Sequence, residues 1–214
     1  MIGFRKYTAT ALGALMIAAA PMAASALSLS FSGFSVADTI PGNFDLNAVT
    51  GLSTGDSLTV FDSAHVGGLK VSDPTTIKVT YLGSEAGNNN QVFELTAGGA
   101  LLFDNNTSSV GDMASFVDDG DFIDFLFRDN TDNEEIENGN TGVAPTGLRL
   151  AFSDISADGR SVIALFGDGA GDTDFDDIAV RISAIPVPAA GIMLLTALGG
   201  LGGVGALRRR RKAA

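Results

Sequence analysis

Residues 178–183, Ile-Ala-Val-Arg-Ile-Ser, decide the fold class of this chain. Ile178, Val180 and Ile182 alternate with small or polar residues, which is the period of a β-strand with one buried face. Working outward, the same alternation recurs at 76–81 (TIKVTY) and 148–152 (LRLAF). Weaker strand candidates are 29–36, 58–61, 91–95, 122–127 and 162–166. The pattern therefore predicts a chain built mainly from short strands.

Clusters of Gly, Asn and Asp separate these strands, as at 87–90 (GNNN) and 139–142 (GNTG), where they tolerate turn conformations. No helical stripe of useful length occurs before residue 185. Short strands at this spacing favour an all-β fold, and we expect a β-sandwich of jelly-roll type. The acidic stretch 129–137 is interpreted as a mobile charged loop.

An aspartate-rich segment, GDGAGDTDFDD at 167–177, runs directly into the deciding strand. Its carboxylates can supply the hard oxygen ligands that Ca²⁺ prefers, and its glycines let backbone carbonyls turn inward. The candidate Ca²⁺ ligands are Asp168, Asp172, Asp174, Asp176 and Asp177. The segment is not an EF-hand, because the sixth position counted from Asp172 is Asp177 rather than Gly. A solvated acidic turn is the alternative, and 118–121 (DDGD) is a weaker Ca²⁺ candidate.

The tail that follows the strand is typical of a membrane segment. Residues 187–207 form an uncharged apolar run, about 31 Å long as a helix and matched to a hydrocarbon core of about 30 Å. Behind it stand Arg208, Arg209, Arg210, Arg211 and Lys212, a stop-transfer cluster that should stay on the cytoplasmic side. We therefore expect a transmembrane helix at 187–207.

The N-terminus has the pattern of a signal peptide. Arg5 and Lys6 precede an apolar stretch, 8–20, and Ala24 and Ala26 form a small-residue cleavage site. We expect signal peptidase and the export machinery to act on this segment and leave a mature N-terminus near Leu27. The predicted organisation is a signal peptide at 1–26, an ectodomain at 27–184 and a C-terminal segment at 185–214.

The predicted ectodomain is strongly acidic. It holds all 25 acidic residues of the chain but only six basic ones, a net charge of −19. Such a surface repels nucleic acid and favours cations, so no nucleic-acid partner is expected. Since the chain has no cysteine, the ectodomain must depend on its core or on bound ions instead of disulfides.

The C-terminal segment resembles the PEP-CTERM class of sorting signals in its VPLPA-type variant. The resemblance rests on Pro186, Val187, Pro188 and Ala189, followed by a Gly-rich apolar run and an Arg-rich end. Ile185 and Val187 stand where that variant usually has Val and Leu. The resemblance implies recognition by an exosortase, a membrane-embedded cysteine protease-transpeptidase of Gram-negative bacteria.

An exosortase would cut near the proline pair and pass the ectodomain to the cell surface or the extracellular matrix. The alternative is a permanent single-pass anchor. The aspartate-rich segment also resembles the D-x-D-F-[DN]-D turn that often precedes such signals, which implies a β-rich extracellular domain and no particular activity.

Two motifs suggest catalysis only superficially. The G-x-S-x-G at 51–55 has Asp62 and His65 downstream, but the triad motif needs a strand before it and a helix after it. The G-x-G-x-x-G at 200–205 lies inside the apolar run, where no nucleotide-binding unit can follow. With one histidine and no cysteine, thiol chemistry and a His-rich zinc site are excluded.

The sequence thus predicts a non-catalytic surface or matrix protein, structural or adhesive, with Ca²⁺ as a candidate cofactor and extracellular polysaccharide as a candidate partner. One alternative is a secreted hydrolase that acts on matrix polysaccharide through paired Asp residues. The other is a periplasmic binding domain that stays anchored in the inner membrane.

Overall fold

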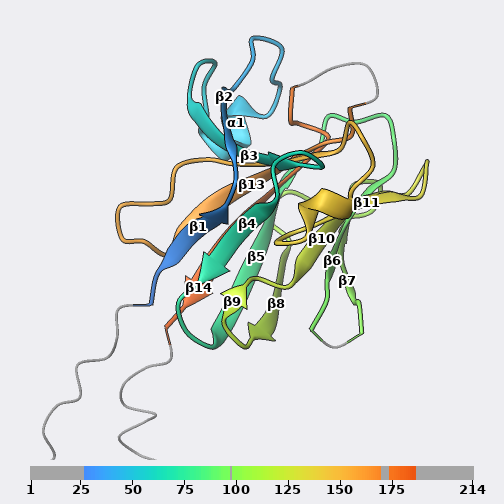
Figure 1. Ribbon diagram of the computed structural model, residues 1–214. Helices are drawn as coiled ribbons and strands as arrows, with labels where there is room; N and C mark the ends of the chain where they lie inside the picture. Colours follow the sequence, from blue (N-terminus) through green and yellow to red (C-terminus); the bar gives the residue numbers. More distant parts are fainter. Residues whose placement is uncertain (1–26, 97, 170–173, 187–214) are drawn as a thin grey trace, which may run out of the picture.

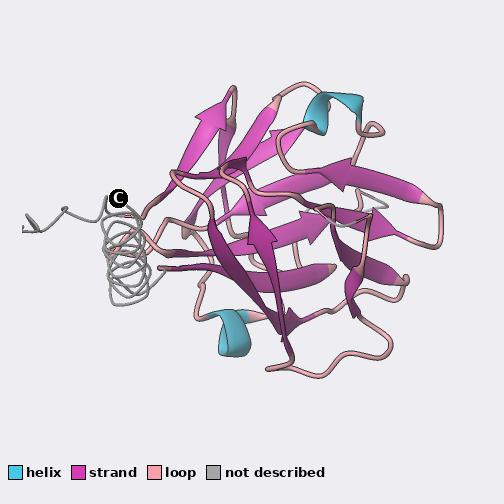
Figure 2. Ribbon diagram, turned by 90° about the horizontal axis from the view of Figure 1, so that it is seen from below, coloured by secondary structure: helices cyan, strands magenta, loops and turns pink. Residues whose placement is uncertain are grey.

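The computed structural model describes residues 27–96, 98–169 and 174–186, and these residues form antiparallel strands in three sheets (Figure 1). The prediction of a β-rich chain is confirmed. Figure 2 shows how little helix accompanies the strands: α1 (Asn47–Thr50) and one 3-10 turn, η1 (Thr141–Val143). The described residues contain no helix that is both long and apolar enough to span a membrane.

Several sequence predictions fall outside the described residues. They are the signal peptide with Ala24 and Ala26, the motif residues Val187, Pro188 and Ala189, the apolar run 187–207, the cluster Arg208–Lys212, and Asp172. Pro186 is described, and it lies exposed just after the last strand.

The largest sheet has seven strands in the order β2-β3-β12-β13-β14-β5-β8. Their bounds are β2 (Val36–Thr39), β3 (Ser57–Asp62), β12 (Arg149–Phe152), β13 (Ser161–Gly167), β14 (Ile178–Ile185), β5 (Thr75–Gly83) and β8 (Met113–Asp118). The deciding strand β14 lies inside this sheet, paired with β13 on one side and β5 on the other. Its apolar residues are therefore buried, as the alternation predicted.

Two smaller sheets complete the fold. One has the order β11-β10-β6-β7, with β11 (Glu134–Glu137), β10 (Phe125–Asp129), β6 (Asn90–Glu94) and β7 (Leu101–Asp104). The other has the order β1-β4-β9, with β1 (Leu29–Gly33), β4 (Gly67–Val71) and β9 (Asp121–Phe122).

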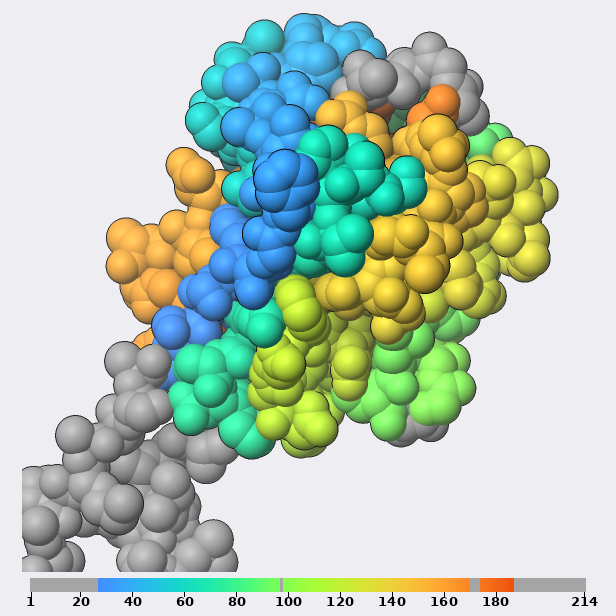
Figure 3. All heavy atoms as spheres, viewed as in Figure 1, coloured from blue at the N-terminus to red at the C-terminus, as the bar shows by residue number. Residues whose placement is uncertain are grey.

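The main core joins all three sheets through aromatic contacts. Phe127 of β10 stacks on Phe166 of β13 with ring centroids 5.4 Å apart, and Phe125 meets Phe152 edge-on at 6.5 Å. A second core lies on the opposite face of the seven-stranded sheet, where the segment around Phe44 and α1 covers Leu165 and its neighbours. In the space-filling view of Figure 3, the first described residues (blue) run along the surface to the light-blue segment at the top of the view.

The structure corrects three predicted segments. The candidate strand 122–127 is divided between β9, which pairs with β4, and β10, which pairs with β6. Residues 29–36, expected as one strand, are divided between β1, which pairs with β4, and β2, which pairs with β3. The break follows Gly33, whose φ of +105° and close approach to the Val66 carbonyl leave no room for a Cβ atom.

The third correction concerns 129–137, expected as a mobile loop. Residues 134–137 form β11, because Ile136 is buried and pairs with Phe127 across the sheet. One apolar side chain among acidic neighbours is enough to fix a half-buried strand, and the charge pattern alone hid it.

Both described ends of the chain lie at one end of the molecule, which we name the terminal pole (Figure 1). Ser28 and Ser72 are joined by hydrogen bonds of 3.2 and 3.0 Å, and Thr75 Oγ1 donates to the Ile185 carbonyl at 2.7 Å. Because β5 runs away from this pole and β14 runs back towards it, Gly83 and Ile178 lie at the opposite end, the distal pole.

The aromatic core makes a testable prediction about stability. Phe152 is fully buried against three other phenylalanines, so Phe152→Ala should lower the free energy of unfolding by about 3–5 kcal/mol, measured by urea denaturation. Phe34→Ala is the matched control, since Phe34 is 69% exposed, and it should change stability by only about 0.5 kcal/mol. Equal losses in the two variants would contradict this assignment of the core.

Candidate functional site

The aspartate-rich segment reaches the distal pole, and the structure divides it into two groups. Asp174 and Asp176 turn towards the segment that contains Asn43 and Asp45. Asp168 and Asp177 belong instead to a group around the loop 88–90. The sequence spacing suggested a single set of ligands, but its described members face different neighbours.

The first group holds two buried carboxyls. Asn43 Nδ2 donates to Asp174 Oδ2 at 2.6 Å, and the Asp45 amide donates to Asp176 Oδ2 at 2.6 Å. Asp174 is 5% exposed and Asp176 is 0% exposed, and Asp176 Oδ1 has no hydrogen-bond partner. Burial raises the pKa of the Asp176 carboxyl above its ordinary value, and the Asp45 amide only partly offsets this effect.

Phe175, between these two aspartates, anchors the turn. It is buried in the second core, and the Arg149 guanidinium lies 4.5 Å from the centre of its ring. Its φ of +63° is unusual for a bulky residue, so packing must hold the backbone in a strained conformation. Arg149 is in turn fixed by an ion pair of 2.6 Å with Asp38.

The second group adds a residue that sequence reasoning missed. Asn88 Nδ2 donates to Asp168 Oδ2 at 3.0 Å and to Asp129 Oδ2 at 3.4 Å. The Asp168 amide donates to Asp177 Oδ2 at 2.7 Å. Asp129 is distant in sequence from the aspartate-rich segment, and only the pairing of β10 with β6 brings it here.

The proposed ligands of the aspartate-rich segment do not all lie in the described residues, since Asp172 is outside them. Within the described ranges, no three acidic or histidine side chains are arranged as a metal site. Ca²⁺ binding by this segment stays a prediction.

The weaker Ca²⁺ candidate at 118–121 is built as a turn. Asp118 is buried and accepts hydrogen bonds from the amides of Gly120 at 2.9 Å and Asp124 at 3.0 Å. Asp121 forms an ion pair of 2.5 Å with Lys70. Burial raises the pKa of the neighbouring Asp124, and the charges of Asp118 and Asp119 add to this shift. These contacts account for Asp118 and Asp121 as structural residues.

The G-x-S-x-G segment has the wrong context for a nucleophile. Ser53 comes after α1, not before a helix, and its amide donates to Asp56 at 2.8 Å. His65 Nδ1 lies 2.8 Å from Asp62 Oδ1 in a local turn. Among the described hydrogen bonds, none joins Ser53 to His65, so these residues do not form a triad in this arrangement.

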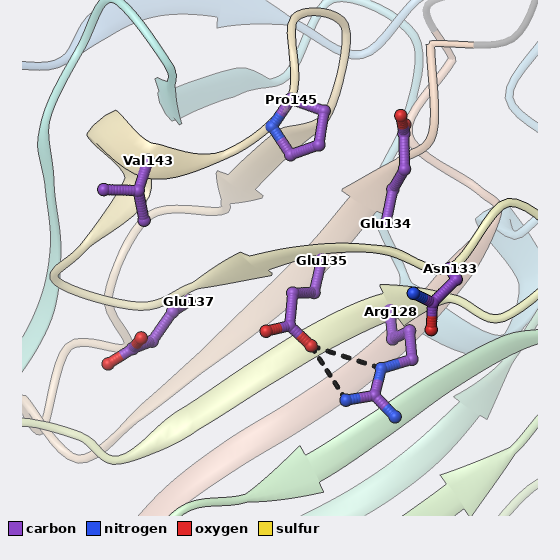
Figure 4. A pocket seen from close by; sticks show the side chains of 7 residues that line it. All are labelled: Arg128, Asn133, Glu134, Glu135, Glu137, Val143 and Pro145. Carbon is purple, nitrogen blue, oxygen red and sulfur yellow. Dashed lines mark hydrogen bonds and ion pairs between the residues drawn. The ribbon is translucent and has the colours of Figure 1, made fainter.

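A shallow hollow lies beside β10 and β11 (Figure 4). It is lined by Arg128, Asn133, Glu134, Glu135, Glu137, Val143 and Pro145. The Arg128 guanidinium donates twice to Glu135 Oε2, at 2.8 and 3.2 Å, and lies 4.5 Å from the Phe93 ring. Since the Arg128 guanidinium is already paired with Glu135, the polar groups that the hollow offers to a ligand are mainly carboxylates.

Comparison with known proteins finds no family model that matches this chain and no curated protein that is significantly similar to it.

The buried Asp176 makes a testable prediction about pH. A carboxyl whose pKa is raised in the folded state favours the folded state when protonated, so its stabilising effect is lost as the pH rises through that pKa. In chelator at pH 7, Asp176→Asn should therefore raise the melting temperature, by about 2–4 °C for each kcal/mol of relieved penalty.

This advantage should be smaller in a buffer at pH 4, because the raised pKa leaves a larger share of the wild-type carboxyl protonated there than at pH 7. Asp154→Asn, at an exposed position, is the control for loss of one charge and should have little effect. An Asp176→Asn variant that melts lower than the wild type at both pH values would refute the expected penalty.

Proposed function

We propose that this chain is a non-catalytic exported protein, sorted by an exosortase-type protease and displayed as a structural or adhesive component of the cell surface or extracellular matrix. Its three sheets would form a β-sandwich of jelly-roll type between the signal peptide and the sorting segment. Matrix polysaccharide is the proposed partner, and Ca²⁺ is the proposed cofactor.

The position of the chain ends is the observation that carries this proposal. Ser28 and Ile185 lie together at the terminal pole, next to the two segments whose sequences are typical of a leader and a membrane tail. A domain held by this pole presents its distal pole, with the acidic loops, away from the membrane. Such an orientation suits a protein whose partner lies outside the cell.

Charge supports an extracellular partner reached through cations. A domain of net charge −19 repels an anionic lipid surface and an anionic polysaccharide alike. Divalent cations bound at its acidic loops would neutralise part of this charge and allow contact. The same charge argues against a resting position flat on the membrane.

The hydrolase alternative needs an acid pair that a polymeric substrate can reach. Asp174 and Asp176 are the acid pair of the aspartate-rich segment, but they are only 5% and 0% exposed. A sugar chain cannot approach such carboxyls without a rearrangement of the turn. We therefore favour the non-catalytic function over the hydrolase.

The sorting proposal is tested by intact-mass spectrometry of the protein recovered from the cell surface. We expect an N-terminus near Leu27 and a C-terminus near Pro188 or Ala189, because the proline pair should hold an extended segment open to the protease. A double variant, Pro186→Ala with Pro188→Ala, should not be cleaved, so it should retain the C-terminal segment with Lys212 and remain in the inner membrane.

Ile185→Val is the matched control, since it moves the segment towards the usual motif and should be processed like the wild type. A wild-type protein that retains Lys212 in the inner membrane would instead favour the permanent anchor.

A further inference from the structure

Three buried side-chain atoms in the described residues lack a hydrogen-bond partner: Asn89 Oδ1, Asn90 Oδ1 and Asp176 Oδ1. All three are oxygens, and all belong to segments at the distal pole, where the Glu85 amide donates to the Asp176 carbonyl and Asn90 Nδ2 reaches the Asp177 carbonyl. Buried oxygens without donors need an explanation, such as a water or a cation. Their concentration at one pole points to a ligand there.

Asn90 faces a buried carboxylate. It lies directly opposite Asp129 across the β6/β10 pair, and residues so paired share one face of the sheet. The backbone N–H and carbonyl of Asn90 both bond to Asn105, on the other side of β6. The Asn90–Asp129 pair is thus of the non-hydrogen-bonded kind, in which Cα atoms approach to about 4.5 Å.

Asp129 carries a charge that no basic residue balances. It is 2% exposed, and the four ion pairs among the described residues do not include it. Oδ1 accepts a hydrogen bond from the Thr131 amide at 2.8 Å, and Oδ2 accepts one from Asn88 Nδ2 at 3.4 Å. Neutral donors compensate a buried carboxylate only partly, so this position favours a cation.

The Asn88 amide occupies the place between two carboxylates. Its Nδ2 contacts Asp129 at 3.4 Å and Asp168 at 3.0 Å, so one partly positive group bridges two negative ones. The oxygen and nitrogen of a side-chain amide are nearly the same size, and a half-turn of the group exchanges them. Asn88 can therefore offer Oδ1 to a cation that takes the bridging position.

We propose that Asn88, Asn90, Asp129 and Asp168 form a Ca²⁺ site at the distal pole. The buried, unpartnered Oδ1 of Asn90 is assigned to this group because Asn90 pairs with Asp129 across the sheet and its Nδ2 donates to the Asp177 carbonyl. Asp177 is a positioning residue, since its carboxylate holds the Asp168 backbone amide at 2.7 Å. The proposal deepens the proposed function by giving its cation a specific ligand set.

The chemistry of the ligands selects the ion. Two carboxylates with two amide oxygens suit Ca²⁺, which accepts six to eight oxygens in flexible geometry, better than Mg²⁺, which needs a near-ideal octahedron. None of the four proposed ligands is a histidine or a cysteine, the residues that favour zinc. Because amide oxygens complete the set, the site does not need the three converging acidic side chains that the described residues lack.

The test is Ca²⁺ binding by the full-length protein in detergent, measured by calorimetry and by melting in Ca²⁺ against chelator. The wild type should bind Ca²⁺ and melt higher with it. Asp129→Asn should weaken binding by about tenfold or more, and in chelator it should melt higher than the wild type because the buried charge is gone. A purely structural Asp129 would instead lower the melting temperature equally in both conditions.

Asn90→Asp is a second variant, and its melting temperature in chelator should change in the opposite direction to that of Asp129→Asn. A new carboxylate facing Asp129 should lower the melting temperature in chelator and enlarge the rise that Ca²⁺ produces, since the ion then meets three charges. Asp154→Asn, at an exposed position outside both Ca²⁺ candidates, is the control for net charge and should bind like the wild type.

Two results would overturn the proposal. One is a wild type that binds no Ca²⁺, or that responds equally to Mg²⁺ and in every variant, as expected from screening of an acidic surface. The other is binding that survives Asp129→Asn but is lost in Asp174→Asn or Asp176→Asn, which would assign the ion to the first group. Neither result affects the mass-spectrometric test of sorting, so the two proposals fail separately.

Discussion

The contact of Phe127 with Phe166 joins the four-stranded sheet to the seven-stranded sheet, and the rest of the structure depends on this aromatic layer. The chain has no cysteine, so burial of large apolar side chains is its main source of stability, at about 1.5–3 kcal/mol for each phenylalanine. The same strands carry the acidic loops at their distal ends: β10 ends at Asp129, two residues after Phe127, and Asp168 follows Phe166 by two. The core thus sets the distance between the two carboxylates that Asn88 bridges.

The seven-stranded sheet has a core on each face, and the aspartate-rich segment links both to the distal pole. Phe175 enters the second core, while Ile178 begins β14 within the main one. The residues between them cannot shift without unpacking one core or the other, which explains how a strained φ persists at Phe175. Asp174, Asp176 and Asp177 are therefore held in fixed directions by their apolar neighbours. This rigidity is what a preorganised set of oxygen ligands requires.

The sequence predicted those parts of the structure that depend on local pattern. The alternation at 178–182 identified β14 because the side chains of a sheet alternate whatever their partners are. It could not reveal that 29–36 breaks at Gly33, since the cause is the distant Val66 carbonyl. The aspartates of 167–177 were found by composition, but their spacing did not show that they divide between two groups. Asn88, Asn90 and Asp129 were missed as a group because only the strand register places residue 90 opposite residue 129. The run of three asparagines at 88–90 was the available signal, and it was interpreted only as a turn.

The buried aspartates Asp129 and Asp176 of the distal pole are costly to stability, because no basic residue of the described chain forms an ion pair with them. Asparagine at position 129 would keep the shape and the bond to the Thr131 amide without burying a charge, and the chain uses asparagine at three positions nearby. Elsewhere the described basic residues neutralise carboxylates, as Arg149 does for Asp38 and Lys70 for Asp121. Asp118 is also buried without a basic partner, but both of its oxygens accept backbone amides, whereas Asp176 at the distal pole keeps one buried oxygen without a donor. Local rules are broken in this way mainly at functional sites, where the missing charge is brought by something other than the chain. The proposed Ca²⁺ site gives these buried acids a role, because a bound cation would supply the positive charge that the aromatic core and its strands do not.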